Sequence, residues 1–258
     1  MKITTWNVNS LAVRLPQVID WLAANPVDVL CLQELKLSDD KFPVQALQDV
    51  GYHSAFMGQK TYNGVALLSR SAGRHVAKNI AGFADEQSRV ITATFDSPLG
   101  EVRVINGYFV NGQAPGTDKF AYKMKWLDAL RAHVQGEMTV HPRIVLLGDF
   151  NITVDDRDTY DAEGLRETIH HTLEERQHFQ ALIDSGLTDA FRLFDQPEKS
   201  YSWWDYREFA FRRNRGLRID HILVSEPLKP HVVGCTIDRL PRKNERPSDH
   251  APVTVELI

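Results

Sequence analysis

The chain has 258 residues, a formal net charge of −4 at pH 7 and a pI near 6.2. A chain of this length can bury a sizeable core, and about 250 residues is a common size for one β-rich layered domain, so we expect a single domain over residues 1–258. The acidic balance excludes a polycation that coats nucleic acid over its whole surface. Any binding to an anionic polymer must therefore be local.

The two cysteines, Cys31 and Cys235, lie far apart in separate apolar runs. This pattern supports neither a zinc knuckle nor a disulfide framework and favours a reducing compartment, which we expect to be the cytoplasm. The first residues reach polar Asn7 too early for the apolar core of a signal peptide. We therefore expect no secretion signal, and we expect no membrane span because no apolar run approaches the required length.

Short runs of β-branched and aliphatic residues predict β-strands along the whole chain. The runs cover residues 2–8, 27–32, 64–68, 90–95, 102–110, 144–147, 219–224 and 252–257. Turn-forming residues between Asp96 and Gly100 predict a hairpin that joins the fourth and fifth of these runs. At least part of the sheet structure is therefore expected to be antiparallel.

Apolar residues at intervals of three and four predict helices over residues 15–24, 41–50, 120–133 and 173–185. Both ends of the last helix are marked in the sequence, because Thr172 and Glu175 form a capping box and Gly186 supplies the stop. No linker, low-complexity tract or short repeat divides the chain.

Polar side chains collect where the predicted strands end. They are Asn7 with Asn9, Gln33 with Glu34, Asp149 with Asn151, Asp220 with His221, and Asp249 with His250. Residues two apart in an extended chain face the same side, so each of the pairs Asn7/Asn9 and Asp149/Asn151 can point into one site. Carboxylate and amide oxygens suit a hard divalent cation such as magnesium, and the substrate would then carry phosphate.

Hydrolysis of a phosphate diester needs a base or anchor for the attacking water, stabilisation of the phosphoryl oxygens and help for the leaving oxygen. In this set, Asp149 can hold or deprotonate the water and His250 can donate a hydrogen bond to a phosphoryl oxygen. Asn151 can orient the water and Glu34 can hold the metal. Asp220 can fix the tautomer of His250.

Six segments occur in the order that is typical of the exonuclease III family of DNA repair nucleases. They are residues 5–9 (TWNVN), 32–36 (LQELK), 107–108 (GY), 148–151 (GDFN), 216–220 (GLRID) and 246–252 (RPSDHAP). The chain resembles this family, which is part of the endonuclease, exonuclease and phosphatase superfamily, from Met1 to Leu257. The resemblance implies an α/β (α+β) fold of the deoxyribonuclease I type, a four-layered sandwich of two packed mixed β-sheets flanked by helices.

The resemblance also implies a magnesium-dependent hydrolase, with manganese as a substitute, that acts as a monomer on double-stranded DNA with abasic sites, nicks or blocked 3′ ends. The implied reactions are incision on the 5′ side of abasic sites and removal of 3′ blocking groups and nucleotides. By position, Glu34 becomes the principal metal ligand with Asn7 and Asp249 nearby. The catalytic set becomes Tyr108, Asp149, Asn151, Asp220, Asp249 and His250. Whether Asp149 or His250 handles the water stays open.

The same resemblance assigns residues that face DNA. Arg89, Lys119 and Asn111, which stands where many relatives have glutamine, match positions that approach phosphate, and Trp203, Trp204, Leu217 and Ile219 match the region that receives the unpaired sugar. A flat apolar wall can accept a deoxyribose that lacks its base. Because Trp203 and Trp204 alternate across a strand, one of them is expected to belong to the core.

Two further features concern specificity. Residues 207–218 hold five arginines, Arg212 and Arg213 among them, against one acid, and form either a contact for the DNA backbone or a solvated loop. His170 lies just before the Thr172 cap, where several relatives have smaller residues. A loop there can lean over the pocket for the abasic sugar, so His170 is expected at the pocket rim, where it would hinder a flipped abasic site and spare 3′-end trimming.

Three functions compete for this sequence. The first is a DNA repair nuclease of the exonuclease III type, including a variant that cleans 3′ ends with little abasic incision. The second is a phosphoesterase on small lipid or inositol phosphates, which the arginine segment and the tryptophan pair disfavour. The third is a DNA-end binding protein without activity, which the presence of the metal and base residues disfavours.

Overall fold

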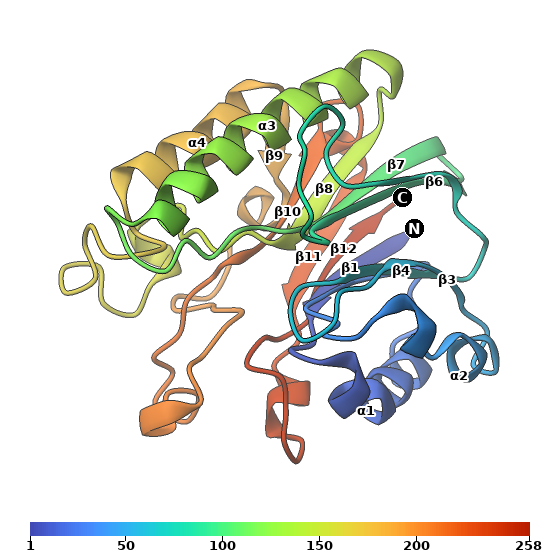
Figure 1. Ribbon diagram of the computed structural model, residues 1–258, viewed down its shortest axis with the longest axis horizontal. Coiled ribbons are helices and arrows are strands. Elements are labelled where there is room, and N and C mark those ends of the chain that lie inside the picture. Colours follow the sequence, from blue (N-terminus) through green and yellow to red (C-terminus); the bar gives the residue numbers. More distant parts are fainter.

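Two six-stranded β-sheets form the centre of the structure, a computed structural model that describes residues 1–258 (Figure 1). The first sheet has the order β11-β12-β1-β2-β4-β3 and the second has the order β5-β6-β7-β8-β10-β9. The strands of the first are β1 (Lys2–Asn7), β2 (Val29–Gln33), β3 (His53–Met57), β4 (Val65–Ser69), β11 (Val232–Ile237) and β12 (Val253–Leu257). Those of the second are β5 (Arg74–Lys78), β6 (Val90–Ser97), β7 (Gly100–Tyr108), β8 (Ile144–Asp149), β9 (Leu187–Asp189) and β10 (Asp220–Ser225).

Helices cover the outer faces of both sheets. Helices α1 (Leu11–Ala24) and α2 (Val44–Gln48) share an apolar cluster with the first sheet, and α3 (Asp118–Val140) and α4 (Leu173–Asp184) share one with the second. A further apolar cluster fills the space between the sheets, with side chains such as Val29 and Val255 from one sheet and Val104 and Val145 from the other. The expected four-layered sandwich is therefore confirmed, and both sheets are mixed because β1 pairs with β2 and β7 with β8 in parallel.

The eight predicted strands correspond to β1, β2, β4, β6, β7, β8, β10 and β12, and the predicted hairpin joins β6 to β7 with Ser97 opposite Gly100. The four strands that the sequence did not predict, β3, β5, β9 and β11, are the four edge strands. An edge strand exposes more of its side chains or is short, and β5, with the sequence RHVAK, is largely exposed. Such strands carry no long apolar run, which is why periodicity missed them.

The four predicted helices are present with different lengths. Helix α1 begins four residues earlier than predicted, at Leu11, α2 is shorter, and α3 extends from Asp118 to Val140. The Thr172 and Glu175 capping box is formed as predicted at the start of α4. No helix in the structure is both long enough and apolar enough to span a bilayer.

A buried pair of amides joins the two sheets. The side chain of Gln33 at the end of β2 donates to Asn106 Oδ1 on β7 at 2.7 Å, and Asn106 Nδ2 donates to the carbonyls of Leu32 and Ala66, both at 3.0 Å. Both amide side chains are fully buried. Because Glu34 follows Gln33 and Tyr108 lies two residues beyond Asn106, this pair fixes the end of one sheet against the end of the other.

Candidate active site

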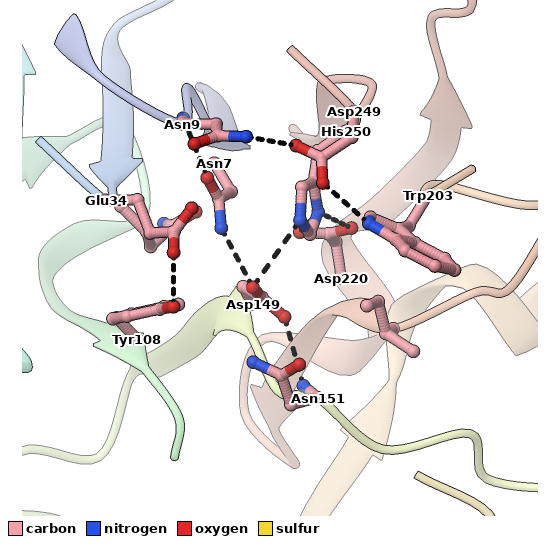
Figure 2. Close-up of polar contacts among 12 residues, drawn as sticks. Asn7, Asn9, Glu34, Tyr108, Asp149, Asn151, Trp203, Asp220, Asp249 and His250 are labelled. Atoms are coloured by element: carbon pink, nitrogen blue, oxygen red, sulfur yellow. Dashed lines mark hydrogen bonds and ion pairs between the residues drawn. The ribbon is translucent and has the colours of Figure 1, made fainter. Parts of the chain in front are cut away.

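Most of the polar side chains predicted at the strand ends meet in one place, at the seam between the two sheets (Figure 2). Two do not: Gln33 joins the sheets through Asn106, and His221 donates to the Ile152 carbonyl. The first sheet supplies Asn7 and Glu34, at the carboxyl ends of the parallel strands β1 and β2, and Asp249 and His250, just before β12. The second sheet supplies the set Tyr108, Asp149, Asn151 and Asp220. Strands β12 and β10 run antiparallel to β1 and β8, so their amino ends arrive at the same edge.

His250 lies between two carboxylates. Its Nδ1 is 2.9 Å from Asp220 Oδ2 and its Nε2 is 3.6 Å from Asp149 Oδ2, and all three side chains are buried. Because a carboxylate can only accept a hydrogen bond, Nδ1 carries a proton and donates a hydrogen bond to Asp220. Burial by itself lowers the pKa of His250, but the charges of Asp220 and Asp149 outweigh it and raise the pKa to about 10. The imidazole is therefore protonated at neutral pH, and its Nε2–H, which is too far from Asp149 for a hydrogen bond, is free to donate.

Asp149 is held by donors on both of its oxygens. Asn7 Nδ2 donates to Oδ2 at 2.9 Å, and the main-chain N–H of Asn151 donates to Oδ1 at 3.0 Å. Burial raises the pKa of Asp149 to about 7, and the positive charge of His250 limits that rise. A carboxylate with a pKa near neutrality has the basicity that a general base for water requires.

Glu34 and Tyr108 form the second half of the site. The Tyr108 hydroxyl donates to Glu34 Oε1 at 2.5 Å, and burial, with the charge of Glu34 beside it, raises the pKa of this phenol well above its usual value. Arg89 lies 5.0 Å from the centre of the Tyr108 ring and donates to the Tyr108 carbonyl at 3.1 Å. The phenol is therefore a neutral donor that orients Glu34.

Hydrogen bonds from two residues orient the Asp249 carboxylate. Asn9 Nδ2 donates to its Oδ1 at 3.0 Å, and Trp203 Nε1 donates to its Oδ2 at 2.9 Å. The neighbouring Ser248 hydroxyl donates to the Asn7 carbonyl at 2.6 Å, which ties the loop before β12 to the end of β1.

Two groups of side chains qualify as metal ligands on residue type. Asp149, Asp220 and His250 present ligand atoms within 4.8 Å of one another, but Nδ1 of His250 donates to Asp220 and therefore has no lone pair for a metal. The oxygens of Glu34, Asn7 and Asp249 form the other group. Glu34 Oε2 accepts no hydrogen bond and lies 3.8 Å from Lys36 Nζ, and the Glu34 side chain is 19% exposed. A carboxylate with access to solvent, beside further carboxylate and amide oxygens, fits a hard divalent cation.

Cavities open on both sides of this centre. One, of about 690 Å³, is lined by Arg89, Tyr108, Asn111 and Lys119, among others. The other, of about 520 Å³, is lined by His170, Trp203 and Leu217, among others. Asn111 and His170 both bond to Asn151, which therefore lies between the two cavities.

Of the residues assigned to DNA, two are buried away from both cavities and a third is held by other partners. Trp204 and Ile219 are buried, and Trp204 packs in a small cluster with Tyr201, so of the two tryptophans Trp203 faces the cavity and Trp204 belongs to the core. Arg89 is 8% exposed, and its guanidinium bonds to Gln87 and to the Tyr108 carbonyl. It lines its cavity but is already engaged in holding Tyr108.

The arginine segment is less uniform than its sequence indicated. Arg218 is buried and pairs with Asp158 and Asp189. A charge that is removed from water needs such partners, so Arg218 is not part of a basic surface. Arg215 pairs with Glu208 of the same segment, and Arg207 pairs with Asp205, just before it. Arg212 and Arg213 are exposed and form no ion pair, so they are the two free cations of the segment.

Two arginines of the site had no signal in the sequence. Arg14 donates to the carbonyls of Asn9 at 2.5 Å and Pro247 at 3.0 Å, and Arg242 donates to the Ser248 carbonyl at 2.5 Å. Both support the loops that carry Asn9, Asp249 and His250. Arginine side chains are mostly exposed to solvent, and only the three-dimensional packing shows the role of these two.

Comparison with known proteins places the whole arrangement in one family. Residues 4–250 match the "Endonuclease/Exonuclease/phosphatase family". The chain belongs to this family. It is 37% identical to "Exodeoxyribonuclease III" of Haemophilus influenzae over 266 aligned positions, which cover 100% of both chains.

Solved structures agree with that assignment. A 3′ phosphatase, NExo from Neisseria bound to a product DNA hairpin, is 53% identical with a TM-score of 0.97, and the match covers 100% of this chain and 99% of that one. An AP endonuclease from Archaeoglobus fulgidus is 33% identical with a TM-score of 0.94 and the same coverage. The resemblance to the exonuclease III type that the sequence indicated is therefore confirmed, and so are the predicted class of enzyme, a hydrolase of DNA phosphodiester bonds, and the predicted fold.

Proposed function

We propose that this chain is a magnesium-dependent DNA repair hydrolase, a monomer of one domain, that removes 3′ blocking groups and nucleotides from double-stranded DNA and incises abasic sites. The observation that carries the proposal is the array in which His250 lies between Asp220 and Asp149, beside Glu34 and Tyr108. The array places Asp149, a buried carboxylate with a pKa near neutrality, beside His250, a cationic hydrogen-bond donor. Such a pair suits attack of water on a phosphate.

In the proposed reaction, Asp149 takes a proton from the attacking water, and the oxygen of that water forms the new bond to phosphorus. His250 Nε2–H donates to a phosphoryl oxygen and stabilises the charge that develops there. Asp220 keeps the imidazole protonated and oriented through Nδ1. The bond from phosphorus to the 3′ oxygen breaks, and that oxygen takes a proton from solvent, which leaves the DNA with a 3′ hydroxyl.

Glu34, with Asn7 and Asp249, would hold the metal ion. When bound, a divalent cation withdraws charge from the phosphoryl and leaving oxygens. Magnesium is proposed because the ligands are all oxygens, and manganese would substitute because it accepts the same ligands. Tyr108 keeps one oxygen of Glu34 occupied and leaves the other for the metal.

The two cavities support double-stranded DNA as substrate. Asn111 and Lys119 offer polar and cationic groups in one cavity, and Trp203 and Leu217 offer an apolar wall in the other. Arg212 and Arg213 add free positive charge near the second cavity, whose lining includes Arg207 and Arg215 of the same segment. Contacts of this kind read the phosphate backbone and not the sequence.

A second version of this function has its own support. His170 lines the cavity that holds the Trp203 wall, and burial lowers its pKa to about 3, so that a neutral ring occupies this space. Its Nδ1 donates to the Asn151 carbonyl at 2.7 Å, which fixes the ring in place. An abasic sugar that enters this cavity would meet the ring. The enzyme would then favour 3′-end cleaning over abasic incision.

One assay tests both versions. A labelled duplex with a central abasic analogue and a nicked duplex that ends in a 3′ phosphate are each incubated with the enzyme and Mg2+, and each again with chelator. Processing of both substrates supports the general repair nuclease, and processing of the nicked duplex alone supports the 3′-end cleaner. If neither is processed in the presence of Mg2+ or Mn2+, the proposed function is wrong.

A further inference from the structure

A lysine ammonium is buried directly behind the active site. Lys123 lies on α3 and its side chain is fully buried. Its Nζ donates to the Asn151 carbonyl at 2.8 Å, to the Asn111 carbonyl at 3.2 Å and to Glu175 Oε1. An ammonium group has three hydrogens, so every donor of this buried charge has a partner.

Glu175, the acidic partner, is as fully committed as the lysine. Its Oε2 accepts from the N–H and the hydroxyl of Thr172, at 3.1 and 2.8 Å, in the cap of α4. Its Oε1 accepts, besides the lysine, the main-chain N–H of His170 at 3.1 Å. The ion pair therefore joins α3, the start of α4 and the loop that presents His170 to its cavity.

The main chain of Asn151 depends on this ion pair. Its carbonyl accepts from both Lys123 and the His170 ring, so two donors hold the peptide group that follows Asn151. Its φ angle of 52° lies in the left-handed region, which asparagine tolerates better than most residues with a side chain, and these contacts help to hold it there. The Asn151 N–H, in turn, is one of the two donors that hold Asp149.

Asn111 is tied to the same point. Its carbonyl accepts from Lys123, and its side-chain Nδ2 donates to Asn151 Oδ1 at 3.2 Å. The next residue is Gly112, with φ +86°, where an added Cβ would lie 2.9 Å from the Lys123 Cδ atom. The lysine stem thus passes close against the main chain of this loop, and one ammonium fixes two loops that reach the cavities on either side of Asn151.

We propose that Lys123 is a positioning residue for phosphodiester hydrolysis. Its ammonium sets the main chain of Asn151 and Asn111, and through Asn151 it sets the direction of Asp149. It does not touch the DNA, because no part of its side chain is exposed. This proposal rests on the proposed function, and the experiment below separates the two.

A second ion pair that reaches α3, between Arg103 on β7 and Glu137 on the helix, supplies a matched control. Arg103, 5% exposed, donates to Glu137 at 2.6 Å and to the His75 carbonyl at 2.7 Å. Like the Lys123 pair, it ties α3 to its surroundings, but Arg103 lies near the start of β7, and the active site lies at the end of that strand. Loss of the Arg103 pair loosens the same helix without reaching Asn151.

The experiment compares the neutral double variants K123M/E175Q and R103M/E137Q with the wild type. Replacing both partners leaves no unpaired buried charge, and such replacements are often neutral or stabilising. The Gln at position 175 keeps an N3 residue that can complete the helix cap. For each protein, kcat on the 3′-phosphate duplex, Kd for an uncleaved duplex and the side-chain amide NMR signals of Asn111 and Asn151 are measured.

K123M/E175Q is expected to lose about 10- to 100-fold in kcat, with Kd for DNA changed by less than about threefold and the amide signals of Asn111 and Asn151 shifted. R103M/E137Q is expected to keep kcat and both signals. Wild-type kcat in K123M/E175Q, or equal losses in both double variants, would overturn the proposal. If K123M/E175Q does not fold, K123R takes its place with the same expectation, because a planar guanidinium cannot reproduce the three directions of the ammonium.

Failure of the proposed function gives a different result. In that case the wild type itself does not hydrolyse the duplex, and the amide signals alone decide the role of Lys123. Shifts of both signals in K123M/E175Q and not in the control would still show that Lys123 sets the two loops, and unshifted signals would overturn that role as well.

Discussion

Nε2 of His250 lies 3.6 Å from Oδ2 of Asp149, too far for a hydrogen bond, while Nδ1 of the same ring donates to Asp220 at 2.9 Å. One side of the imidazole is thus fixed, and the other side shares an open gap with the carboxylate of Asp149. A phosphoryl oxygen or a water that enters the gap meets a donor and a base together. The sequence left open whether Asp149 or His250 handles the water. This geometry favours Asp149 as the base and His250 as the hydrogen-bond donor.

The role of Asp220 predicts a change in the pH dependence of D220N. The wild-type ring stays protonated up to about pH 10, because Asp220 and Asp149 outweigh the effect of burial on its pKa. Asn can still accept from Nδ1 but carries no charge, so the pKa of His250 falls and the alkaline limb of kcat/KM moves to lower pH. A profile of kcat/KM against pH with the alkaline limb in its wild-type place would contradict the assignment.

R212A/R213A should bind duplex DNA more weakly and with less dependence on salt. If both exposed arginines contact phosphates, the slope of log K against log salt should fall by about 1.8, at about 0.9 for each contact. R131A removes a partly exposed arginine of α3 that pairs with Asp128; it serves as the control and should leave the slope unchanged. An unaltered slope in the double variant would support the alternative interpretation, that the segment is a solvated loop.

H170S should raise abasic-site incision relative to removal of a 3′ phosphate. The smaller residue vacates part of the cavity of about 520 Å³ where the ring now stands. Serine cannot reach the Asn151 carbonyl as the imidazole does, so some loss in 3′-phosphate removal is also expected. The matched variant H178S changes a histidine of α4 outside that cavity and should leave the ratio unaltered. The hindrance hypothesis fails if abasic incision by H170S equals that of the wild type.

The buried Asp158 predicts a loss of stability in acid. Burial by itself raises its pKa, but Arg218 and the nearby Arg192 hold the pKa well below that of a free carboxylate. A lowered folded pKa means that the stabilisation is complete above the unfolded pKa of about 3.9 and is lost as pH falls below it. D158N should therefore lose about 3 kcal/mol near neutral pH, the lower end for a broken buried pair, since Arg218 keeps only Asp189 as a charged partner.

Urea unfolding monitored by fluorescence measures this loss. D96N, which removes an exposed partner of Arg74, is the control and should leave the stability nearly unchanged. Equal stability of D158N and the wild type at pH 7 would show that the buried pair contributes nothing net.

The sequence predicted most of the structural elements that leave a continuous pattern of residues along the chain. The inner strands have apolar runs, and the Thr172 cap has its Glu175 partner three residues later. The edge strands β3, β5, β9 and β11 were missed because exposure or short length removes that pattern. Periodicity showed that one of Trp203 and Trp204 is core, but which one depends on the loop geometry that turns Trp203 toward Asp249.

Buried charged residues are the second kind of feature that the sequence did not predict. Lys123 and Arg218 are buried, although lysine and arginine are almost always exposed unless they are paired. Their partners, Glu175 and Asp158, lie 52 and 60 residues away in the chain, so no local pattern announces either pair. Positions that match the family motifs were placed at the site by the resemblance, whereas the residues that support them became visible only in three dimensions.

The most direct test of the site is hydrolysis of the 3′-phosphate duplex by D149N and H250N beside the wild type, with DNA binding measured on the same samples. Each variant removes one side of the gap between Asp149 and His250, so kcat should fall by about 10²- to 10⁴-fold while DNA binding is retained. Near-normal hydrolysis by either variant would contradict the assignment of Asp149 and His250 as the reacting pair.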